Sequence, residues 1–265
     1  MAPDDLDPSA ITKLLEREGA LLEVEVLASC TSTNSVLLER AAGPRPLLLI
    51  ADEQRAGRGR RGRQWVTQRG AALTFSLRWQ FHTPAQALRG LSLAAGVALA
   101  RALRAMGARE VGLKWPNDLL VAGRNAKLGG ILVETHAAGA GTAAIIGVGL
   151  NYRSVPELEK NLMRRIAALE ELLEPLPRRD ALAARLAAEL VRALRAFETG
   201  GLAAFSEEWE SLHAFRGQRL SVSTDDGLTL AGTAEGIGAD GALLLRTGSG
   251  LRSIYNGSVV PARAA

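Results

Sequence analysis

The sequence has few of the residues that build disulfide frameworks and metal sites. It contains one cysteine, Cys30, and three histidines that lie far apart, His82, His136 and His213. A single cysteine excludes a disulfide framework and a cysteine-rich zinc site, and the histidine spacing does not match a structural metal site. Aromatic residues make up only 4% of the chain.

Long apolar runs are also missing. No stretch approaches the roughly 20 apolar residues that a membrane helix needs. The N-terminal segment MAPDDLDPSA is acidic and lacks the basic and apolar regions of a signal peptide. With 265 residues, 47% of them hydrophobic, the chain can bury a substantial core. We expect a soluble, cytoplasmic protein without a membrane segment.

Positive charge is concentrated in one short segment. The chain has 32 basic and 28 acidic residues, and this net charge of +4 by itself suggests a nucleic-acid or membrane-surface binder. Five arginines, however, lie between positions 55 and 63 with no acid among them, and the rest of the chain sums to −1. The excess charge therefore belongs to one loop. Lysine is rare, with only four in the chain, and this draws attention to Lys114 and Lys127.

Hydrophobic periodicity predicts a chain in two parts. A period of 3.6 residues predicts helices, and alternating or continuous apolar runs predict strands. In the first part we expect strands at 21–26, 46–52, 72–79, 111–115, 116–123, 127–134 and 143–152, and helices at 8–18 and 85–106. Two further helices are expected within 157–199, separated by PLPRR at 175–179, with a third at 202–213. After Gly217, short alternating strands are separated by Asp-Gly and Gly-Ser turns. The pattern predicts a mixed domain over 20–213 and a small β-barrel over 214–265.

The segment GRGRRGRQW at 57–65 is typical of an anion-binding loop. Its glycines allow unusual backbone angles and expose N–H groups, and its arginines supply bidentate donors for phosphate or carboxylate. Trp65 offers a flat face on which a base can stack. The alternatives are a solvated basic loop or an RNA contact. The sequence GxxxxGK[ST] is absent, so this is not a Walker A loop.

Further polar segments follow at strand ends. The segments are STN at 32–34, KWPND at 114–118, KLGGIL at 127–132 and GVGLN at 147–151. Taken singly, each has an ordinary structural explanation: a helix cap, a turn, an exposed strand start and a strand terminus. In the second segment, Asp118 is a candidate magnesium ligand or proton acceptor, and Lys114 can neutralise charge nearby. In the third, Lys127 precedes two glycines that a ligand can approach closely.

These segments, in this order, together resemble the biotin–protein ligase family. The resemblance rests on STN, QRAGRGRRGRQW at 54–65, KWPND, KLGGIL and GVGLN, and extends over about residues 22–152. It implies an α+β fold, in which a seven-stranded mixed β-sheet is flanked by helices and followed by a small C-terminal β-barrel. Only about 20 residues precede the first expected strand, fewer than the ~50–60 of a helix-turn-helix domain. We expect the form without an N-terminal DNA-binding domain.

The resemblance implies an ATP-dependent ligase with biotin and ATP as substrates and Mg²⁺ bound with ATP. Such an enzyme forms biotinyl-5′-adenylate and passes the biotinyl group to one lysine of a biotin carboxyl-carrier protein or domain. Its oligomeric state is expected to be a monomer or a homodimer.

Site residues follow from the same resemblance. It implies that the catalytic residues are Lys127, Arg60 and Asp118. It implies biotin contacts for Ser32, Thr33, Asn34, Gln54, Gly57, Arg58, Gly59, Arg60, Lys127, Gly130, Gly147 and Gly149. It implies adenylate contacts for Trp65, Asn117, Asn151 and Arg63. Asp118 matches either magnesium binding or activation of the acceptor lysine, and the sequence leaves both open.

Two other functions compete with this interpretation. Lipoate–protein ligases and lipoyl or octanoyl transferases share the catalytic fold but lack the arginine loop followed by KWPND. A non-enzymatic RNA- or DNA-binding protein would use the basic loop, and its affinity would depend strongly on salt. The near-neutral remainder of the chain and the lack of aromatic residues interleaved with the arginines argue against it.

Overall fold

The main architectural element is a seven-stranded mixed sheet. The computed structural model describes residues 6–17, 22–40, 43, 45–139, 141–162, 165–225 and 227–262. The sheet has the order β1-β2-β3-β7-β6-β5-β4, and only the β1–β2 pair is parallel among the pairs of this sheet that are described. Its strands are β1 (Glu23–Leu27), β2 (Leu47–Ala51), β3 (Ala72–Phe81), β4 (Val111–Lys114), β5 (Asp118–Val121), β6 (Ala126–Ala138) and β7 (Gly141–Asn151).

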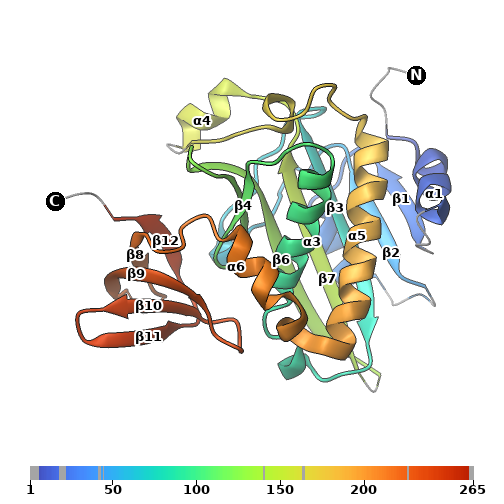
Figure 1. Cartoon of the computed structure of the whole chain (residues 1–265). Helices are drawn as coiled ribbons and strands as arrows, with labels where there is room; N and C mark the ends of the chain where they lie inside the picture. The colour runs from blue at the N-terminus through green and yellow to red at the C-terminus, as the bar shows by residue number, and fades with distance from the viewer. Residues whose placement is uncertain are drawn as a thin grey trace.

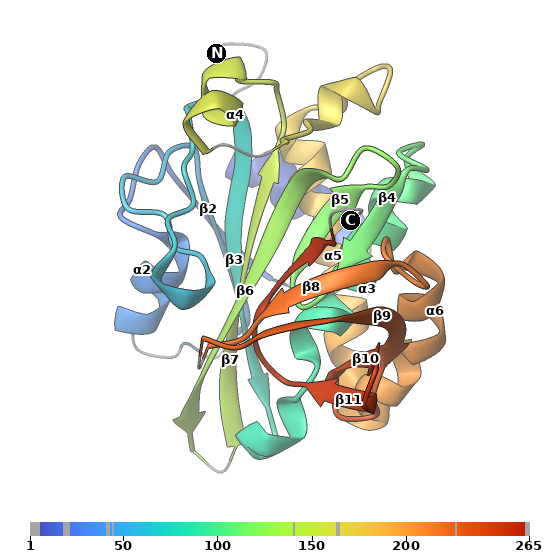
Figure 2. The ribbon, with the colours of Figure 1, turned by 90° about the vertical axis from the view of Figure 1, so that its left-hand side faces the viewer.

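Helices cover both faces of this sheet. α3 (Leu91–Ala105) and α5 (Arg179–Gly200) lie on one face, with α1 (Pro8–Arg17) packed against α5 (Figure 1). α2 (Thr33–Glu39) covers the opposite face, so that the sheet lies between the two layers (Figure 2). The central strands β2, β3 and β7 therefore bury nearly all of their residues on both sides, as expected for a sheet with helices on both faces.

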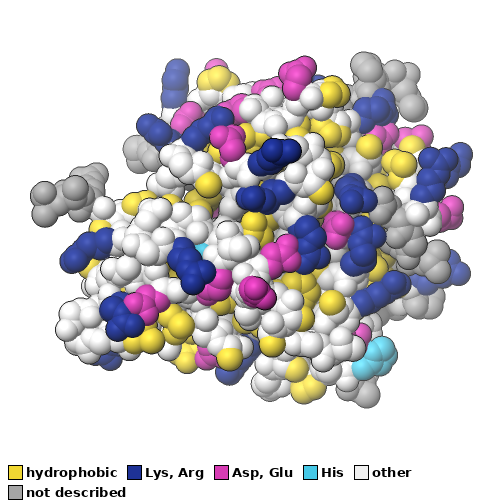
Figure 3. Space-filling model, viewed as in Figure 1, with side chains coloured by type: hydrophobic (Ala, Val, Ile, Leu, Met, Phe, Trp, Pro, Cys, Tyr) yellow, Lys and Arg dark blue, Asp and Glu magenta, His cyan; other side chains and the backbone are white. Residues whose placement is uncertain are grey.

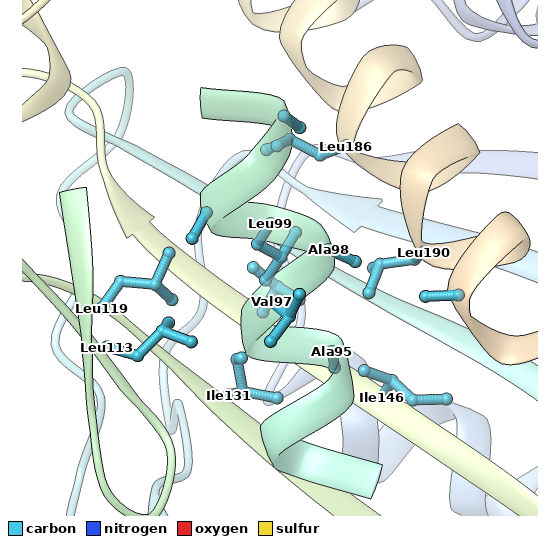
Figure 4. Close-up of a cluster of buried hydrophobic side chains, with 14 of the residues drawn as sticks. Ala95, Val97, Ala98, Leu99, Leu113, Leu119, Ile131, Ile146, Leu186 and Leu190 are labelled. Carbon is cyan, nitrogen blue, oxygen red and sulfur yellow. The ribbon is translucent and has the colours of Figure 1, made fainter. Parts of the chain in front are cut away.

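The larger core lies between the sheet and α3 and α5. Ala95, Val97, Ala98 and Leu99 of α3 point toward strand residues such as Ile131 and Ile146 and toward Leu186 and Leu190 of α5 (Figure 4). A smaller cluster on the other face joins Leu37 of α2 to β2 and β7. Strand residues alternate between the two clusters, and this alternation positions the candidate site.

The end of the described chain forms a second sheet. After α4 (Pro156–Leu162) and α6 (Ser206–Leu212) come β8 (Arg219–Ser223), β9 (Thr229–Ile237), β10 (Leu243–Thr247), β11 (Gly250–Ile254) and β12 (Ser258–Pro261). These strands are antiparallel in the order β11-β10-β9-β8-β12. The expectation of a closed barrel is not met in the described part of the chain, because β11 pairs with β10 and β12 with β8, but β11 and β12 do not pair.

Several contacts join the two sheets. Trp115 Nε1 donates to the carbonyl of Gly241 at 3.0 Å, and the backbone N–H of Ala214 donates to the carbonyl of Leu113 at 2.8 Å. One buried cluster extends from the main sheet to Leu220 and Leu243. The domain limits 20–213 and 214–265 remain a prediction. Within the described residues, no helix is both long and apolar enough for a membrane span.

Candidate active site

A cavity of about 890 Å³ opens beside the main sheet. Its walls come from the start of α2, the loop that contains residues 58–66, the strands β5, β6 and β7, and residues 257–261 of the C-terminal sheet. Segments far apart in the sequence therefore meet in one site. From the residues expected to form it, the lining includes Ser32, Thr33, Asn34, Gln54, Arg58, Gly59, Arg60, Arg63, Trp65, Asn117, Asp118, Lys127, Gly130, Gly147 and Gly149.

Glycines in β7 make the depth of this cavity possible. Side chains of β7 alternate, and Ile145 packs into the smaller cluster on the α2 face. Gly147 and Gly149 follow at intervals of two and face the same way. A Cβ atom at Gly147 would lie 2.2 Å from Asn34 Oδ1, and one at Gly149 would lie 2.4 Å from Trp65 Cε2. The missing side chains thus leave the space in which Asn34 and Trp65 lie.

One end of the cavity is a buried network of uncharged polar groups. Gln54 Oε1 accepts hydrogen bonds from the backbone N–H of Thr33 at 2.7 Å and from its hydroxyl at 3.1 Å. Ser76 Oγ lies 2.7 Å from Thr33 Oγ1 and 2.6 Å from Asn34 Oδ1. Ser32 occupies the N-cap position of α2, but its side chain makes no capping bond. Helix capping therefore does not explain that serine, which lines the cavity.

The charged end of the cavity is organised around Asp118. Lys127 Nζ lies 2.5 Å from Asp118 Oδ1, and Lys114 Nζ lies 3.8 Å from Asp118 Oδ2. The three side chains are 16–19% exposed. The Lys127 ammonium also lies 5.7 Å from the centre of the Trp65 ring. Two cations face one carboxylate, so a net positive charge remains for an anionic ligand.

The arginine loop folds back on itself and contacts the C-terminal sheet. The backbone N–H of Gly59 donates to the carbonyl of Arg63 at 2.7 Å, which closes the loop. Arg61 pairs with Asp225 at 2.6 Å, and Arg63 Nη2 lies 3.4 Å from Ser258 Oγ. Burial lowers the pKa of Arg60, against the opposing influence of Asp225 and Asp118. An arginine retains its charge at neutral pH despite such a shift.

Two of the expected residues do not line the cavity. Asn151 Nδ2 donates to the carbonyls of Lys127 and Ala167, both at 3.0 Å, and so fixes the start of β6. Gly57 lies behind the loop, where a Cβ atom would be 2.2 Å from the carbonyl oxygen of Trp65. The structure thus gives both residues supporting positions. Asn117 lines the cavity, and its amide also donates to the carbonyl of Ile131 at 2.6 Å.

The structure also adds residues that the motifs did not identify. Ser76 connects Thr33 to Asn34, and Glu134 binds both Asn34 and Arg58. Glu134 directly follows ILV in the segment KLGGILVE. Its place at the end of this glycine-containing motif is the one sequence feature that could have identified it as a site residue. Ser76 lies inside an apolar strand and shares one face with Thr74 and Arg78, which are also buried and alternate with the apolar core residues.

Magnesium would fit this site only together with a phosphate ligand. Among the described residues, no group of three or more His, Cys, Asp or Glu side chains is arranged to hold a metal ion. Mg²⁺ commonly binds through one or two carboxylates plus substrate phosphates. Asp118 can supply one such carboxylate, while Lys114 and Lys127 compete for the same oxygens. The residues present therefore fit Mg²⁺ that is carried by a nucleotide.

Comparison with known proteins identifies the family. The biotin/lipoate A/B protein ligase family matches residues 26–151, and the C-terminal domain of biotin protein ligase matches residues 217–260. The chain is 38% identical to the bifunctional ligase/repressor BirA of Escherichia coli over 91% of this chain and 74% of that protein. This chain belongs to the biotin protein ligase family. It is also 34% identical to the biotin–[acetyl-CoA-carboxylase] ligase of Mycobacterium tuberculosis, over 91% and 90% of the two chains.

Solved structures of biotin protein ligases have the same fold. The biotin protein ligase of Aquifex aeolicus, solved in complex with biotin and ATP, is similar with a TM-score of 0.77. The two chains are 26% identical, and the match covers 91% of this chain and 99% of the Aquifex chain. The match includes most of both sheets, so the ligase architecture extends over both parts of the fold.

Proposed function

We propose that this chain is an ATP-dependent biotin–protein ligase. It activates biotin as biotinyl-5′-adenylate, releases pyrophosphate, and transfers the biotinyl group to a lysine of a carrier protein of a biotin-dependent carboxylase. The observation that carries this proposal is a single cavity that joins a buried uncharged polar network to a cluster of cations beside Trp65. Its volume of about 890 Å³ lies within the range of small-molecule sites.

The uncharged end suits the ureido ring of biotin. A urea carries two N–H donors and one carbonyl acceptor and has no charge, so it needs neutral partners of both kinds. Ser32, Thr33, Asn34 and Gln54 supply such partners, and the glycines of β7 leave room for the ring. Because an unpaired buried polar group costs about 1–3 kcal/mol, a ligand without a urea binds poorly here. This argument favours biotin over lipoate.

The charged end suits the first half-reaction. A carboxylate oxygen of biotin attacks the α-phosphorus of ATP, and the bond from that phosphorus to the pyrophosphate oxygen breaks. Both reactants are anionic, so Arg60 and Lys127 reduce their repulsion and stabilise the charge that develops, while Arg58, which is paired with Glu134, contacts biotin. Trp65 stacks on the adenine, Arg63 and Asn117 contact the adenylate, and Mg²⁺ enters with ATP. Loss of one such charged contact costs on the order of 3 kcal/mol in transition-state stabilisation.

The second half-reaction forms an amide. The amine of the acceptor lysine attacks the biotinyl carbonyl carbon, AMP leaves, and the lysine nitrogen loses a proton. Asp118 lies among the cations of the site and can either accept that proton or hold Mg²⁺. We expect Asp118→Asn to separate these roles. A loss of ATP–pyrophosphate exchange points to the nucleotide, whereas normal exchange with slow transfer points to the acceptor lysine.

The decisive experiment mixes the protein with MgATP, biotin and an apo carrier domain and follows the carrier mass. Addition of one biotinyl group to the carrier supports the proposal. Exchange that runs with lipoate or octanoate but not with biotin would replace it with a lipoate ligase. The cytoplasmic location and the monomeric or dimeric state remain predictions.

A further inference from the structure

Glu134 lies at the meeting point of the uncharged network and the arginine loop, and no motif assigned it a role. We propose that it is a positioning residue for the biotin end of the site. In this role it fixes the orientation of the Asn34 amide and holds Arg58 beside it. The inference rests on the proposed function, because it concerns how the ligase binds biotin.

A single carboxylate makes all three of the contacts involved. Glu134 Oε2 accepts from Asn34 Nδ2 at 2.9 Å and from Arg58 Nη1 at 3.1 Å. Glu134 Oε1 accepts from Arg58 Nη2 at 2.7 Å. The pairing with Arg58 is bidentate, which fixes direction as well as distance. The carboxylate thus connects a buried residue of α2 to a loop residue.

The Asn34 amide has one favourable orientation in this setting. Its Nδ2 donates to Glu134 and also to the carbonyl of Leu132 at 3.2 Å, while its Oδ1 accepts from Ser76. Turning the amide over would place Oδ1 against a carboxylate and a carbonyl, which are both acceptors. Asn34 is 3% exposed, so water cannot relieve that conflict. Glu134 therefore determines that Asn34 directs an acceptor toward Ser76 and Gly147.

Arg58 is held in the same way. It lies at the start of the loop that contains residues 58–66, and its side chain is 44% exposed. Within hydrogen-bonding distance, the described partners of its guanidinium are Glu134 and, at 3.4 Å, Ser35 Oγ. Removing the carboxylate leaves this cation without an anionic partner. We therefore expect Glu134 to hold the Arg58 guanidinium at the biotin end of the cavity.

The test compares Glu134→Gln with a matched control, Glu235→Gln, in the full chain. Glu235 also forms a bidentate pair, with Arg246 on the C-terminal sheet, and lies outside the cavity. Biotin-dependent ATP–pyrophosphate exchange gives kcat and the KM values for biotin and ATP. For Glu134→Gln we expect the biotin KM to rise about tenfold, while kcat and the ATP KM change less than about twofold. The control should match the wild type.

A second variant distinguishes positioning from support of the fold. The amide introduced by Glu134→Gln retains one side-chain acceptor for Asn34, whereas Glu134→Ala leaves Asn34 Nδ2 only the carbonyl of Leu132. Glu134→Ala should therefore raise the biotin KM further, with the melting temperature within about 2 °C of the wild type. Two results would overturn the inference. One is a biotin KM within twofold of the wild type in both variants. The other is a fall in kcat together with equal rises in the KM values for biotin and ATP, accompanied by a clear fall in melting temperature.

Failure of the proposed function would look different. Wild-type protein that shows no biotin-dependent exchange would refute the ligase activity itself. The role of Glu134 then has an independent readout, because trypsin cleaves after an accessible arginine. Without any ligand, cleavage after Arg58 should be faster in Glu134→Gln than in the wild type and in Glu235→Gln. Equal cleavage in all three proteins would refute the positioning of Arg58.

Discussion

Gly147 and Gly149 show how the absence of a side chain builds a site. They share the face of β7 that carries Ile145, yet each leaves space for a side chain from another segment. The side chain of Asn34 in α2 occupies the space beside Gly147, and the Trp65 ring from the loop occupies the space beside Gly149. Two positions on one strand thus set the size of the two ends of the cavity.

A methyl group added at Gly147 should weaken the binding of biotin, and one added at Gly149 should weaken the binding of ATP. Gly147→Ala should raise the biotin KM by roughly five- to a hundredfold, because overpacking of this kind costs roughly 1–3 kcal/mol. Gly149→Ala should raise the ATP KM by a similar factor, because it displaces Trp65. Gly248→Ala is the control, since a Cβ atom there meets nothing within 4 Å. The same change in both KM values for either cavity variant would contradict this division of the cavity.

Residue motifs predicted much of the lining, because chemistry that binds phosphate and urea needs particular residue types. Lys127, Arg60 and Trp65 were expected and all line the cavity. Glu134 and Ser76 were missed, because their importance comes from a partner on another strand rather than from their own neighbours in the sequence. Asn151 illustrates the converse, since this last residue of the motif GVGLN supports the backbone instead of lining the cavity.

At the scale of elements, the arginine loop is held by the C-terminal sheet. Arg61 pairs with Asp225 between β8 and β9, and Arg63 reaches Ser258 of β12. Five arginines between positions 55 and 63 repel one another, so the loop depends on such partners or on an anionic ligand. The second sheet therefore supports the loop through these side-chain contacts.

Proteolysis can test this dependence. Biotin with MgATP should slow trypsin cleavage within residues 58–63, because the anionic intermediate adds partners for the arginines. Asp225→Asn should speed cleavage without ligand, because the Arg61 pair is lost, while Glu235→Gln serves as the surface control. Equal cleavage rates with and without ligand would show that the loop does not respond to the intermediate.

Arg60 should matter most for retaining the intermediate. Its guanidinium lies in the cavity and is more buried than those of its neighbours in the loop. We expect Arg60→Gly to release biotinyl-5′-adenylate early, so that bystander proteins such as serum albumin become biotinylated. The measurement is the ratio of carrier labelling to bystander labelling. An unchanged ratio would remove this role from Arg60.

The elements themselves were predictable where their pattern is local. Strands such as β2 and β3 and the helix α3 have regular hydrophobic periods, and the structure has them near the expected positions. The open arrangement of the C-terminal strands was not predictable in this way. It depends on pairing between strands separated in the sequence, and β11 and β12 remain the two edges of an open sheet.

At the scale of the whole molecule, side chains of both charges are mixed on the face that carries α5 and α6. Lys and Arg side chains are interspersed with Asp and Glu over the face that carries α5 and α6 (Figure 3). Many of them form pairs, such as Arg101 with Glu208 and Arg192 with Glu189. This mixture gives no continuous basic surface on that face for a polyanion. The net charge of +4 therefore reflects a ligand-binding loop.

The stability of the whole molecule should depend on pH through His213. This side chain is 7% exposed, packs against Trp209, and has an Nδ1 atom without a hydrogen-bond partner. Burial lowers its pKa from 6.5 to about 4. The unfolded chain therefore binds a proton at a higher pH than the folded chain. Stability should be complete above about pH 6.5 and should fall as the pH drops toward 4, by roughly 3 kcal/mol.

Urea unfolding at a series of pH values measures this effect. His213→Leu removes the titrating group and should flatten the slope between pH 6.5 and 4, whatever its stability at pH 7. His136→Gln, at an exposed position, controls for the loss of a histidine. An identical slope in the wild type and in His213→Leu would assign the acid sensitivity to other groups.

The position of β12 has a consequence for how the protein is made. Residues 257–261 line the cavity, although the main sheet is complete by Asn151. A ribosome delivers the chain from its N-terminus, so the main sheet can fold while the C-terminal sheet that contacts the arginine loop is still being synthesised. Until β12 pairs with β8, a nascent chain has an unfinished substrate chamber. Translation itself therefore sets when the ligase becomes able to hold its reactive intermediate.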